Sequence, residues 1–205
     1  WDRFDPETYA SMKGFKDDPG KCWQLFLEML VIIADSKPNP AHHHLASLER
    51  SKFLKAVITQ NIDGLHQIAG SHHVIEIHGT MRNLICMDCN QVISSRGMIF
   101  DSEDLPPICP CGGILKPGAI LFGESIPSKP YFQSLKQIRL ADVVIMIGTS
   151  GIVHPVSEFP EIALSHGAKI IEINPEESVF TRACNTIHLQ GTASEMLKNI
   201  VNNLT

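Results

Sequence analysis

Residues 143–147 read Val-Val-Ile-Met-Ile, a continuous apolar run that Gly148-Thr149-Ser150-Gly151 follows directly. A run of this length without a polar residue is typical of a strand buried on both faces, as in parallel sheets that helices cover. From residue 53 onward, similar short β-branched runs alternate with helical patterns, and this alternation predicts a doubly wound α/β sheet. We expect strands at residues 54–58, 74–77, 119–122, 142–147, 169–173 and 186–189.

Helical patterns account for most of the remaining chain. An apolar helix is expected at residues 20–35, and Lys37-Pro38-Asn39-Pro40 ends it because proline cannot continue a helix. Residues 83–116 interrupt the strand–helix alternation and have little apolar content, so they are interpreted as an insert that a metal holds together. The other expected helices are at 41–49, 62–69, 129–139, 156–166 and 193–202.

The composition argues against several classes of protein. The chain has 205 residues, 43% of them hydrophobic, which suffices for one core and a small additional unit. A net charge of −5 and a pI near 6.0 argue against binding nucleic acid through its phosphates. No apolar run approaches the roughly 20 residues that span a bilayer, and the first residues do not read as a signal peptide. We expect a cytoplasmic protein that binds neither membranes nor nucleic acid.

Four of the six cysteines form two close pairs, Cys86/Cys89 and Cys109/Cys111, with the spacing C-x2-C-x19-C-x-C. This spacing is close to that of zinc ribbons, and four thiolates leave a zinc ion no open position, so the predicted role is structural. Gly112-Gly113 permits the tight turn that such sites need. Because no secretion signal is visible, a metal site is favoured over disulfide bonds between these cysteines. In one alternative, Cys22 or Cys184 replaces Cys111 as the fourth ligand.

Polar residues follow two of the predicted strands at the point where each ends. The sequence T-Q-N-I-D-G-L-H occupies residues 59–66, and His78-Gly79 follows the next strand. Because ligands of open α/β sheets bind beyond the carboxyl ends of the strands, an amide, a carboxylate and an imidazole are expected on one rim, as in a catalytic cleft. The alternatives are structural: Asn61 or Asp63 caps a helix, and His78 is a core histidine.

Three later strand ends carry small polar residues that suit a nucleotide. Gly148-Thr149-Ser150 follows one strand, Asn174 ends the next, and Gly191-Thr192 follows the last. Backbone N–H groups and small hydroxyls at such turns can approach a ribose or a phosphate. Neither G-x-G-x-x-G nor G-x-x-x-x-G-K-S/T occurs, so no phosphate-binding loop is visible.

Taken together, these motifs resemble the sirtuin family of NAD-dependent protein-lysine deacylases. The resemblance covers nearly the whole chain in family order, and it implies a Rossmann-like large domain with a small domain built from a zinc module and a helical module. It places the helical module and lead-in at 1–52, the large domain at 53–82 and 117–205, and the zinc insert at 83–116. The matching motifs are P-N-x-x-H at 38–42, residues 59–66, H-G at 78–79, the cysteine pairs, K-P-x-x-x-x-F-G-E at 116–124, G-T-S at 148–150 and I-N at 173–174.

The resemblance also implies a reaction, in which the acyl oxygen of an acyl-lysine attacks C1′ of the nicotinamide ribose of NAD. Nicotinamide leaves, and the acyl group ends on ADP-ribose. His78 is then the base that deprotonates a ribose hydroxyl, since its ordinary pKa lies near 6.5. Asn61 holds the ribose and a water, and Asp63 receives the nicotinamide carboxamide. The full expected cofactor set is Gln60, Asn61, Ile62, Asp63, Gly148, Thr149, Ser150, Asn174 and Thr192.

The substrate peptide is expected to pair as a strand with residues 119–124, opposite the loop at 152–155, because main-chain pairing gives affinity with little sequence selectivity. Phe122 is expected to line the acyl-lysine channel. Phe26 and Met29 stand where relatives that remove acidic acyl groups have Tyr and Arg, so a neutral acyl group is predicted. The expected substrate-binding residues are Ile120, Phe122, Gly123, Glu124 and Val153.

The sequence departs from the family pattern in several places. Sirtuins begin with a strand leading into Gly-Ala-Gly and Asp-Phe-Arg, a segment that binds the NAD phosphates, whereas Trp1 aligns just after it. We therefore expect upstream residues in the complete protein, and poor NAD binding by residues 1–205 alone. Gly118 replaces a usual Asp, and Leu121 a common aromatic residue. Two alternative functions stay open: an NAD hydrolase or mono-ADP-ribosyltransferase of the same fold, and a truncated, non-catalytic acyl-peptide binder.

Overall fold

The computed structural model describes residues 4–101, 103–183 and 186–204, with the side chains of residues 182–183 left out. The contacts of the chain divide it into two compact units. Unit 1 consists of Trp1–Lys37, Thr59–Leu65 and Glu76–Pro127, and unit 2 of Pro38–Ile58, His66–Ile75 and Ser128–Thr205. Each unit is therefore assembled from three separate stretches of sequence.

Unit 1 combines helices with an antiparallel sheet. The helices are α1 (Pro6–Tyr9), α2 (Met12–Asp17) and α3 (Pro19–Asp35), and the sheet has the order β4 (Val92–Ser94), β3 (Gly79–Cys86), β5 (Leu115–Ala119). Helix α3 buries Trp23 completely, and the indole Nε1 donates a hydrogen bond of 2.9 Å to the carbonyl oxygen of Leu115. A buried indole is stable only when its N–H has such a partner, so this bond ties α3 to β5.

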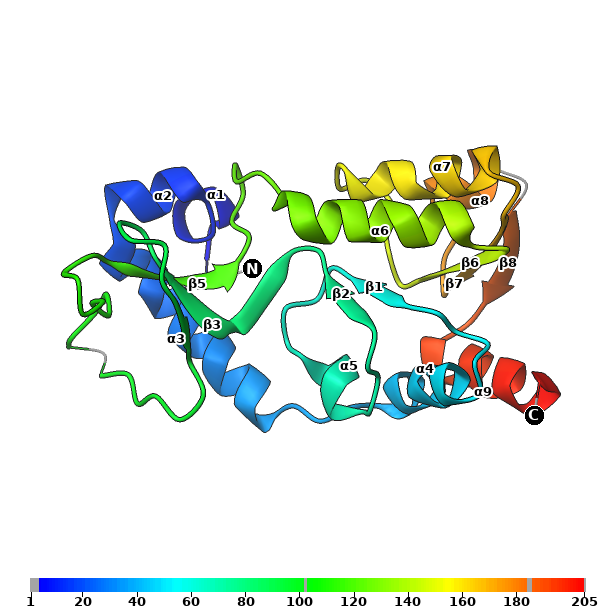
Figure 1. Cartoon of the computed structure of the whole chain (residues 1–205), viewed down its shortest axis with the longest axis horizontal. Coiled ribbons are helices and arrows are strands. Elements are labelled where there is room, and N and C mark those ends of the chain that lie inside the picture. Colours follow the sequence, from blue (N-terminus) through cyan, green and yellow to red (C-terminus); the bar gives the residue numbers. More distant parts are fainter. Residues whose placement is uncertain (1–3, 102, 184–185, 205) are drawn as a thin grey trace. The chain divides into compact units, whose positions relative to one another are not determined.

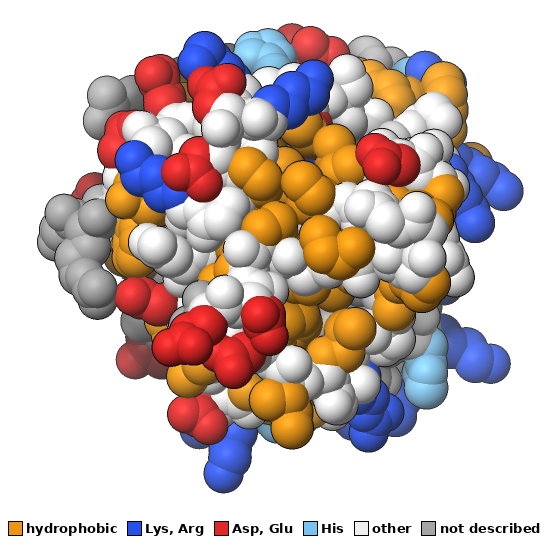
Figure 2. Space-filling model, turned by 90° about the vertical axis from the view of Figure 1, so that its left-hand side faces the viewer, with side chains coloured by type: hydrophobic (Ala, Val, Ile, Leu, Met, Phe, Trp, Pro, Cys, Tyr) orange, Lys and Arg blue, Asp and Glu red, His pale blue; other side chains and the backbone are white. Residues whose placement is uncertain are grey.

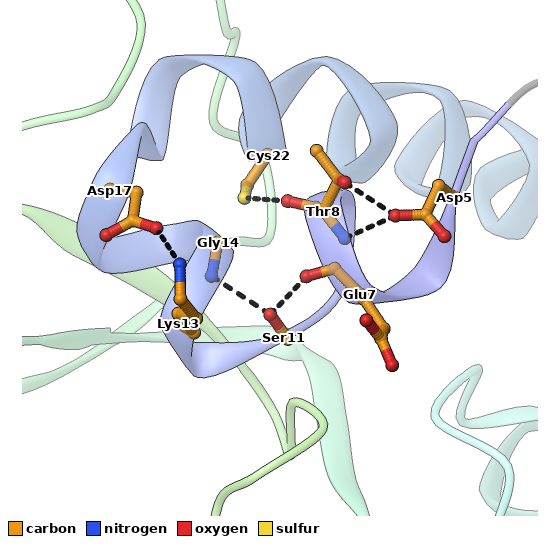
Figure 3. A network of polar contacts seen from close by, with 8 residues as sticks. All are labelled: Asp5, Glu7, Thr8, Ser11, Lys13, Gly14, Asp17 and Cys22. Carbon is orange, nitrogen blue, oxygen red and sulfur yellow. Dashed lines mark hydrogen bonds and ion pairs between the residues drawn. The ribbon is translucent and has the colours of Figure 1, made fainter.

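The first three helices are joined by tight, capped turns (Figure 3). The Ser11 hydroxyl accepts from the Gly14 N–H at 2.9 Å and donates to the carbonyl oxygen of Glu7, so it caps α2 and holds the end of α1. A Cβ on Gly14 would lie 2.1 Å from the carbonyl oxygen of Thr8, so only glycine permits this approach. The Cys22 thiol on α3 also contacts this carbonyl oxygen at 3.5 Å.

Some large hydrophobic side chains of unit 1 remain exposed. Figure 2 shows hydrophobic side chains in the middle of one face of the molecule, with Asp and Glu side chains near them. More than half of a protein surface is ordinarily apolar, so these side chains do not by themselves define an interface. The exposed hydrophobic residues of unit 1 include Val31, Ile32, Val92, Ile99 and Ile108.

Unit 2 contains the parallel sheet that the apolar runs predict. Its strands are β6 (Val143–Ile147), β7 (Lys169–Asn174) and β8 (Thr186–Gln190), paired in parallel with β7 in the middle. Figure 1 shows helices on both sides of these strands, with α6 (Ser128–Leu140) and α7 (Phe159–Ser165) on one side and α4 (Pro40–Arg50) and α9 (Ala193–Leu204) on the other. Helices on both faces of a parallel sheet confirm the predicted doubly wound α/β class.

The core of unit 2 joins residues that are far apart in the sequence. Leu45 and Leu48 of α4 pack in one cluster with Ile173 of β7 and Leu197 of α9. The shorter elements of the chain are α5 (Leu65–Ile68), the 3-10 helix η1 (Val156–Glu158) and α8 (Val179–Ala183), together with the two-stranded sheet of β1 (Val57–Thr59) and β2 (Val74–Glu76). None of the helices that the structure describes is both long and apolar enough to cross a membrane.

One predicted strand is displaced. The sequence predicts a strand at residues 119–122, whereas the structure places β5 at Leu115–Ala119. Lys116, Pro117 and Gly118 have low strand propensity, but every residue of β5 is buried, and pairing with β3 overrides that propensity. The helices α1, α2 and α8 and the strands β3 and β4 are not among the predicted elements. The domain boundaries at residues 52, 82 and 116 stay a prediction.

Candidate metal centre and active site

The four paired cysteines meet at one end of unit 1. Cys86 ends β3, and the Sγ atoms of Cys86, Cys89, Cys109 and Cys111 all lie within 4.8 Å of one another. The Cys86–Cys111 and Cys89–Cys109 Sγ distances are 3.5 Å and 3.8 Å. Four thiolates bound at about 2.3 Å around a tetrahedral zinc ion lie roughly 3.8 Å apart, so the donor set fits zinc.

The backbone around these cysteines is shaped to bring the sulfur atoms together. Gly112 has φ +94°, and a Cβ on Gly113 would lie 2.7 Å from the Sγ of Cys86, so both glycines are required as predicted. The Cys89 N–H donates to the Cys86 sulfur at 3.5 Å, and chiefly for this reason the pKa of Cys86 is lowered to about 7. Such N–H donors stabilise a thiolate ligand.

Cys22, one of the two alternative fourth ligands, does not join the cluster. The Cys22 thiol contacts the carbonyl oxygen of Thr8, and burial raises the pKa of Cys22 to about 11, so this thiol stays protonated. Cys184, like Trp1, lies outside the described residues. Cys111 therefore completes the set.

The residues after β1 form a turn whose shape depends on Gly64. The Asp63 carboxylate accepts from the Leu65 N–H at 2.8 Å, which forms an Asx turn directly before α5. Gly64 has φ +74°, and a Cβ there would lie 2.9 Å from Arg82 Cδ. Arg82 is fixed by an ion pair of 2.6 Å with Glu76 and packs against the turn.

His78 lies between β2 and β3 and is half-buried. Burial lowers the pKa of His78, and a hydrogen bond to the backbone of Gln60 opposes this shift only in part. The imidazole is therefore neutral at neutral pH. A ring N–H that donates to the Gln60 carbonyl leaves the other ring nitrogen as an acceptor, which is what a general base needs.

A close backbone approach explains why a glycine, Gly79, follows this histidine. It has φ +74°, and a Cβ on Gly79 would lie 2.0 Å from the carbonyl oxygen of Gly118 on β5. The backbone of His78 is held at the same place, because its carbonyl oxygen accepts from the Ile120 N–H at 2.9 Å. The close approach of β3 to β5 thus fixes the position of the imidazole.

The segment expected to bind a peptide is already paired in part. Both main-chain groups of Phe122 are engaged, since its N–H donates to the Ala10 carbonyl oxygen and its carbonyl oxygen accepts from the Met12 N–H, both at 2.9 Å. The side chain of Phe122 is 57% exposed. Gly123, with φ +83° and open space where a Cβ would lie, is also exposed. Main-chain pairing with a peptide is consequently expected at Gly123 rather than at Phe122.

The carboxylate of Glu124 has partners within unit 1. Its carboxylate accepts from the Leu121 N–H at 2.6 Å and forms an ion pair of 3.1 Å with the buried ammonium of Lys116. Burial lowers the pKa of Lys116, and Glu124 opposes that shift. Because both partners are internal, the Glu124 carboxylate holds the loop in shape, and the contact of Glu124 with a substrate peptide stays a prediction.

Unit 2 has a cavity of about 390 Å³ beside the carboxyl ends of β6 and β7. This is where ligands of doubly wound sheets bind. Three of the residues expected to bind the cofactor after β6 line it together with Asn174, whereas the Thr192 hydroxyl donates to Glu195 at 2.8 Å and caps α9. Nothing in the sequence indicated that residues 176–179 would line the same cavity. The lining residues are Gly148, Thr149, Ser150, Asn174, Glu176, Glu177, Ser178 and Val179.

The comparisons with known proteins agree with this geometry. The Sir2 family model matches residues 1–155. The NAD-dependent protein deacylase 2 of Archaeoglobus fulgidus is 39% identical over 204 residues, which cover 98% of this chain and 80% of the relative. The NAD-dependent protein deacylase 2 of Pyrobaculum aerophilum is 37% identical over 204 residues, with the same coverage of both chains.

Solved structures extend the similarity to three dimensions. A Sir2 homolog–NAD complex is similar with a TM-score of 0.89 and 35% identity, covering 100% of this chain and 79% of that one. A Sir2–p53 peptide–NAD+ complex is similar with a TM-score of 0.87 and 30% identity, covering 94% of this chain and 81% of that one. Sequence motifs, fold and relatives agree, and the chain belongs to the Sir2 family.

Proposed function

We propose that the protein removes acyl groups from protein lysines in an NAD-dependent reaction that releases nicotinamide and O-acyl-ADP-ribose. The observation that carries this proposal is the neutral, half-buried imidazole of His78, which the backbone of Gln60 holds with one ring nitrogen left to accept a proton. The relatives named NAD-dependent protein deacylases and the Sir2 homolog–NAD complex support it.

NAD supplies an electrophilic ribose carbon, which the acyl oxygen of the lysine amide attacks as nicotinamide leaves. The protein then has to deprotonate a ribose hydroxyl, and His78 is assigned to accept that proton. Asn61, exposed just after β1, is proposed to hold the ribose and a water, with Gln60 beside it.

The nicotinamide end is assigned to the turn that follows β1. The carbonyl oxygen of Ile62 is already engaged, since it accepts from the Met81 N–H at 3.0 Å. The Ile62 N–H is therefore the main-chain group proposed to bind the nicotinamide carboxamide. Asp63 is proposed as its second partner. One of its carboxylate oxygens accepts from the Leu65 N–H, and the second oxygen is assigned to the carboxamide N–H.

The adenosine half of NAD is assigned to the cavity of unit 2. Gly148, Thr149 and Ser150 line one wall of it, and Asn174 lies at the end of the neighbouring strand. Because Thr192 caps α9, its proposed contribution is to fix the turn after β8.

The acyl-lysine is proposed to contact Phe122, Ile120, Gly123 and Val153. Phe122 is 57% exposed and Val153 45% exposed, so both offer apolar surface to an acyl chain. Glu124 is also proposed to adjoin the peptide, while its carboxylate holds the loop. Phe26 is buried against Trp23 in the core of unit 1 and supplies no cation, which supports a neutral acyl group.

Two further assignments concern the surroundings of the site. Zinc bound by Cys86, Cys89, Cys109 and Cys111 is proposed to be structural, because four thiolates leave no open coordination position. The cytoplasm, a reducing compartment, is proposed as the location. Cys22 and the four zinc ligands form no disulfide, and cysteines that bind zinc must stay reduced.

The function is tested with the full-length protein, NAD and an acetyl-lysine peptide. We expect equal amounts of nicotinamide and deacylated peptide, and slower turnover of a succinyl-lysine peptide. Nicotinamide release without any acyl peptide would instead identify an NAD hydrolase. Binding of the acyl peptide without release of nicotinamide would identify a non-catalytic binder.

A further inference from the structure

Glu172 is a carboxylate in the middle of the parallel sheet, and only 1% of its surface is exposed. It lies on β7 and faces Met146 of β6 and His188 of β8 across the two ladders. Its neighbours along the strand, Ile170 and Ile173, are equally buried. An apolar residue would avoid the cost of desolvating a carboxylate, so the carboxylate needs compensating partners and a reason to be there.

The partners of Glu172 come from the residues around the proposed nucleotide cavity. The Thr181 hydroxyl donates to one carboxylate oxygen and the Asn174 amide Nδ2 donates to the other at 3.4 Å. Burial raises the pKa of Glu172, but hydrogen bonds from Ser178, Thr181 and Asn174, with the charge of His188, lower it below its ordinary value. Glu172 is therefore an ionised acceptor at neutral pH.

Through Thr181 the carboxylate fixes the wall of the cavity that precedes α8. The Thr181 hydroxyl also accepts from the Ser178 N–H at 3.0 Å, and the Ser178 hydroxyl accepts from the Phe180 N–H at 3.1 Å. Phe180 in turn packs against Gly151, which directly follows the lining residue Ser150, since a Cβ on Gly151 would lie 2.0 Å from its ring. Contacts from Glu172 thus reach the residues on both sides of the cavity.

Through Asn174 the carboxylate sets which atom of an amide meets the ligand. The Asn174 Nδ2 lies 3.3 Å from the Thr149 carbonyl oxygen and 3.4 Å from Glu172 Oε1. Both of these groups only accept hydrogen bonds, so the NH₂ group must face them. Asn174 Oδ1 is then the atom turned to a ligand in the cavity that Asn174 lines.

We propose that Glu172 is a positioning residue for the adenosine ribose: it orients Asn174 so that Oδ1 accepts from a ribose hydroxyl, and through Thr181 it holds Ser178 at the cavity wall. The inference rests on the proposed NAD-dependent function and adds a residue that does not touch the ligand. Its consequence is selectivity for a nucleotide whose ribose carries free hydroxyl donors.

The test compares Glu172→Gln with the wild-type protein in calorimetric titrations of NAD and of an NAD analogue lacking both hydroxyls on the adenosine ribose. The amide that this substitution introduces can turn its own NH₂ toward Asn174 and reverse the Asn174 amide. We expect the Kd for NAD to rise about tenfold, the worth of one well-placed hydrogen bond, and the Kd for the analogue to stay unchanged. Glu161→Gln, an exposed exchange of the same kind on α7, is expected to change neither.

A conservative pair of variants covers the case in which Glu172→Gln does not fold. Thr181→Ser keeps the hydroxyl that donates to Glu172, and Thr181→Val removes it at nearly constant volume. Weaker NAD binding by Thr181→Val alone supports the proposal. If folded Glu172→Gln loses affinity equally for NAD and the analogue, or if Glu172→Gln or Thr181→Val binds NAD like the wild-type protein, the proposal is wrong. Full-length wild-type protein that binds no NAD would overturn the proposed function itself, and this inference with it.

Discussion

The ammonium of Lys116 lies 3.1 Å from the carboxylate of Glu124, and it also donates to the carbonyl oxygens of Pro117 and Ala119 at 2.8 Å each. The Lys116 side chain is 4% exposed and that of Glu124 is 19% exposed. One buried cation thus binds β5 to the loop that presents Phe122 and Gly123.

Removing this cation should strongly destabilise the protein. Lys116→Met leaves Glu124 without its partner and is expected to lower the free energy of unfolding by about 3 kcal/mol, because an uncompensated buried charge remains. The control is Lys13→Met, whose ion pair with Asp17 is shorter at 2.6 Å but exposed, and this variant is expected to change the free energy of unfolding far less. Urea unfolding measures both. Equal effects would mean that the Lys116 pair is no more than a surface contact.

Gly79 and Gly97 allow the cost of backbone strain to be compared with the cost of a steric clash. Gly79 and Gly97 have φ values of +74° and +78°, but a Cβ lies 2.0 Å from the Gly118 carbonyl oxygen at the first and meets nothing within 4 Å at the second. Gly97→Ala should cost about 1 kcal/mol from its φ alone. Gly79→Ala should cost clearly more and also reduce activity, since His78 precedes it. Thermal unfolding that ranks the two variants equally would contradict the close approach of β3 to β5.

The pH dependence of activity should report His78. Burial lowers the pKa of His78 below its ordinary value, so kcat/KM for NAD is expected to rise with pH through that lowered pKa and to be level at neutral pH. His78→Ala should reduce kcat by about 10²–10⁴-fold and remove this dependence. A profile that still rises between pH 7 and pH 8 would assign the titration to another group.

The same group contributes to stability in a defined direction. Because the folded-state pKa of His78 is lower than the unfolded one, the unfolded chain binds the extra proton as the pH falls. The stability that the wild-type protein gains from a neutral His78 is therefore present above pH of about 6.5 and is lost as the pH falls through the folded-state pKa. Urea midpoints of wild type and His78→Ala between pH 5 and pH 8 test this: the difference between them should change toward low pH.

Metal content should depend on four cysteines and not on a fifth. Cys111→Ser is expected to lose stoichiometric zinc, which mass spectrometry of the metal measures. This variant and the chelator-treated wild-type protein are both expected to unfold at a lower temperature than the zinc-bound wild-type protein. Cys22→Ser should keep its zinc, because Cys22 contacts the Thr8 carbonyl instead. Unchanged stability after complete zinc removal would contradict a structural role.

The elements that the sequence predicts well are those with a local signal. The strand β6 follows from an unbroken apolar run, and the cysteine cluster follows from its spacing. The helices α1 and α2 escape prediction although their caps, Asp5 and Ser11, are visible in the sequence, because helices of four and six residues carry no periodic pattern.

Long-range partners explain the rest. The sequence predicts Glu124 within the segment that pairs with the substrate peptide, but nothing near it in the sequence shows that its carboxylate pairs with Lys116. Glu172 reads as a lone charge in an apolar strand, since its partners Ser178 and Thr181 lie at the start of a later helix. Side-chain pairing across a turn is set by the fold, and propensity carries no trace of it.

Helix α4 and helix α9 bury their apolar faces against each other and β7, through Leu45, Leu48 and Leu197. The chain between α4 and α9, and α9 itself, must leave the ribosome before this contact can form. Until then, α4 has no partner for its leucines, and the growing polypeptide exposes a hydrophobic stripe that invites chaperones or self-association. Substitutions that weaken the α4–α9 contact are therefore expected to lower the yield of soluble protein during synthesis before they change the activity of molecules that have folded.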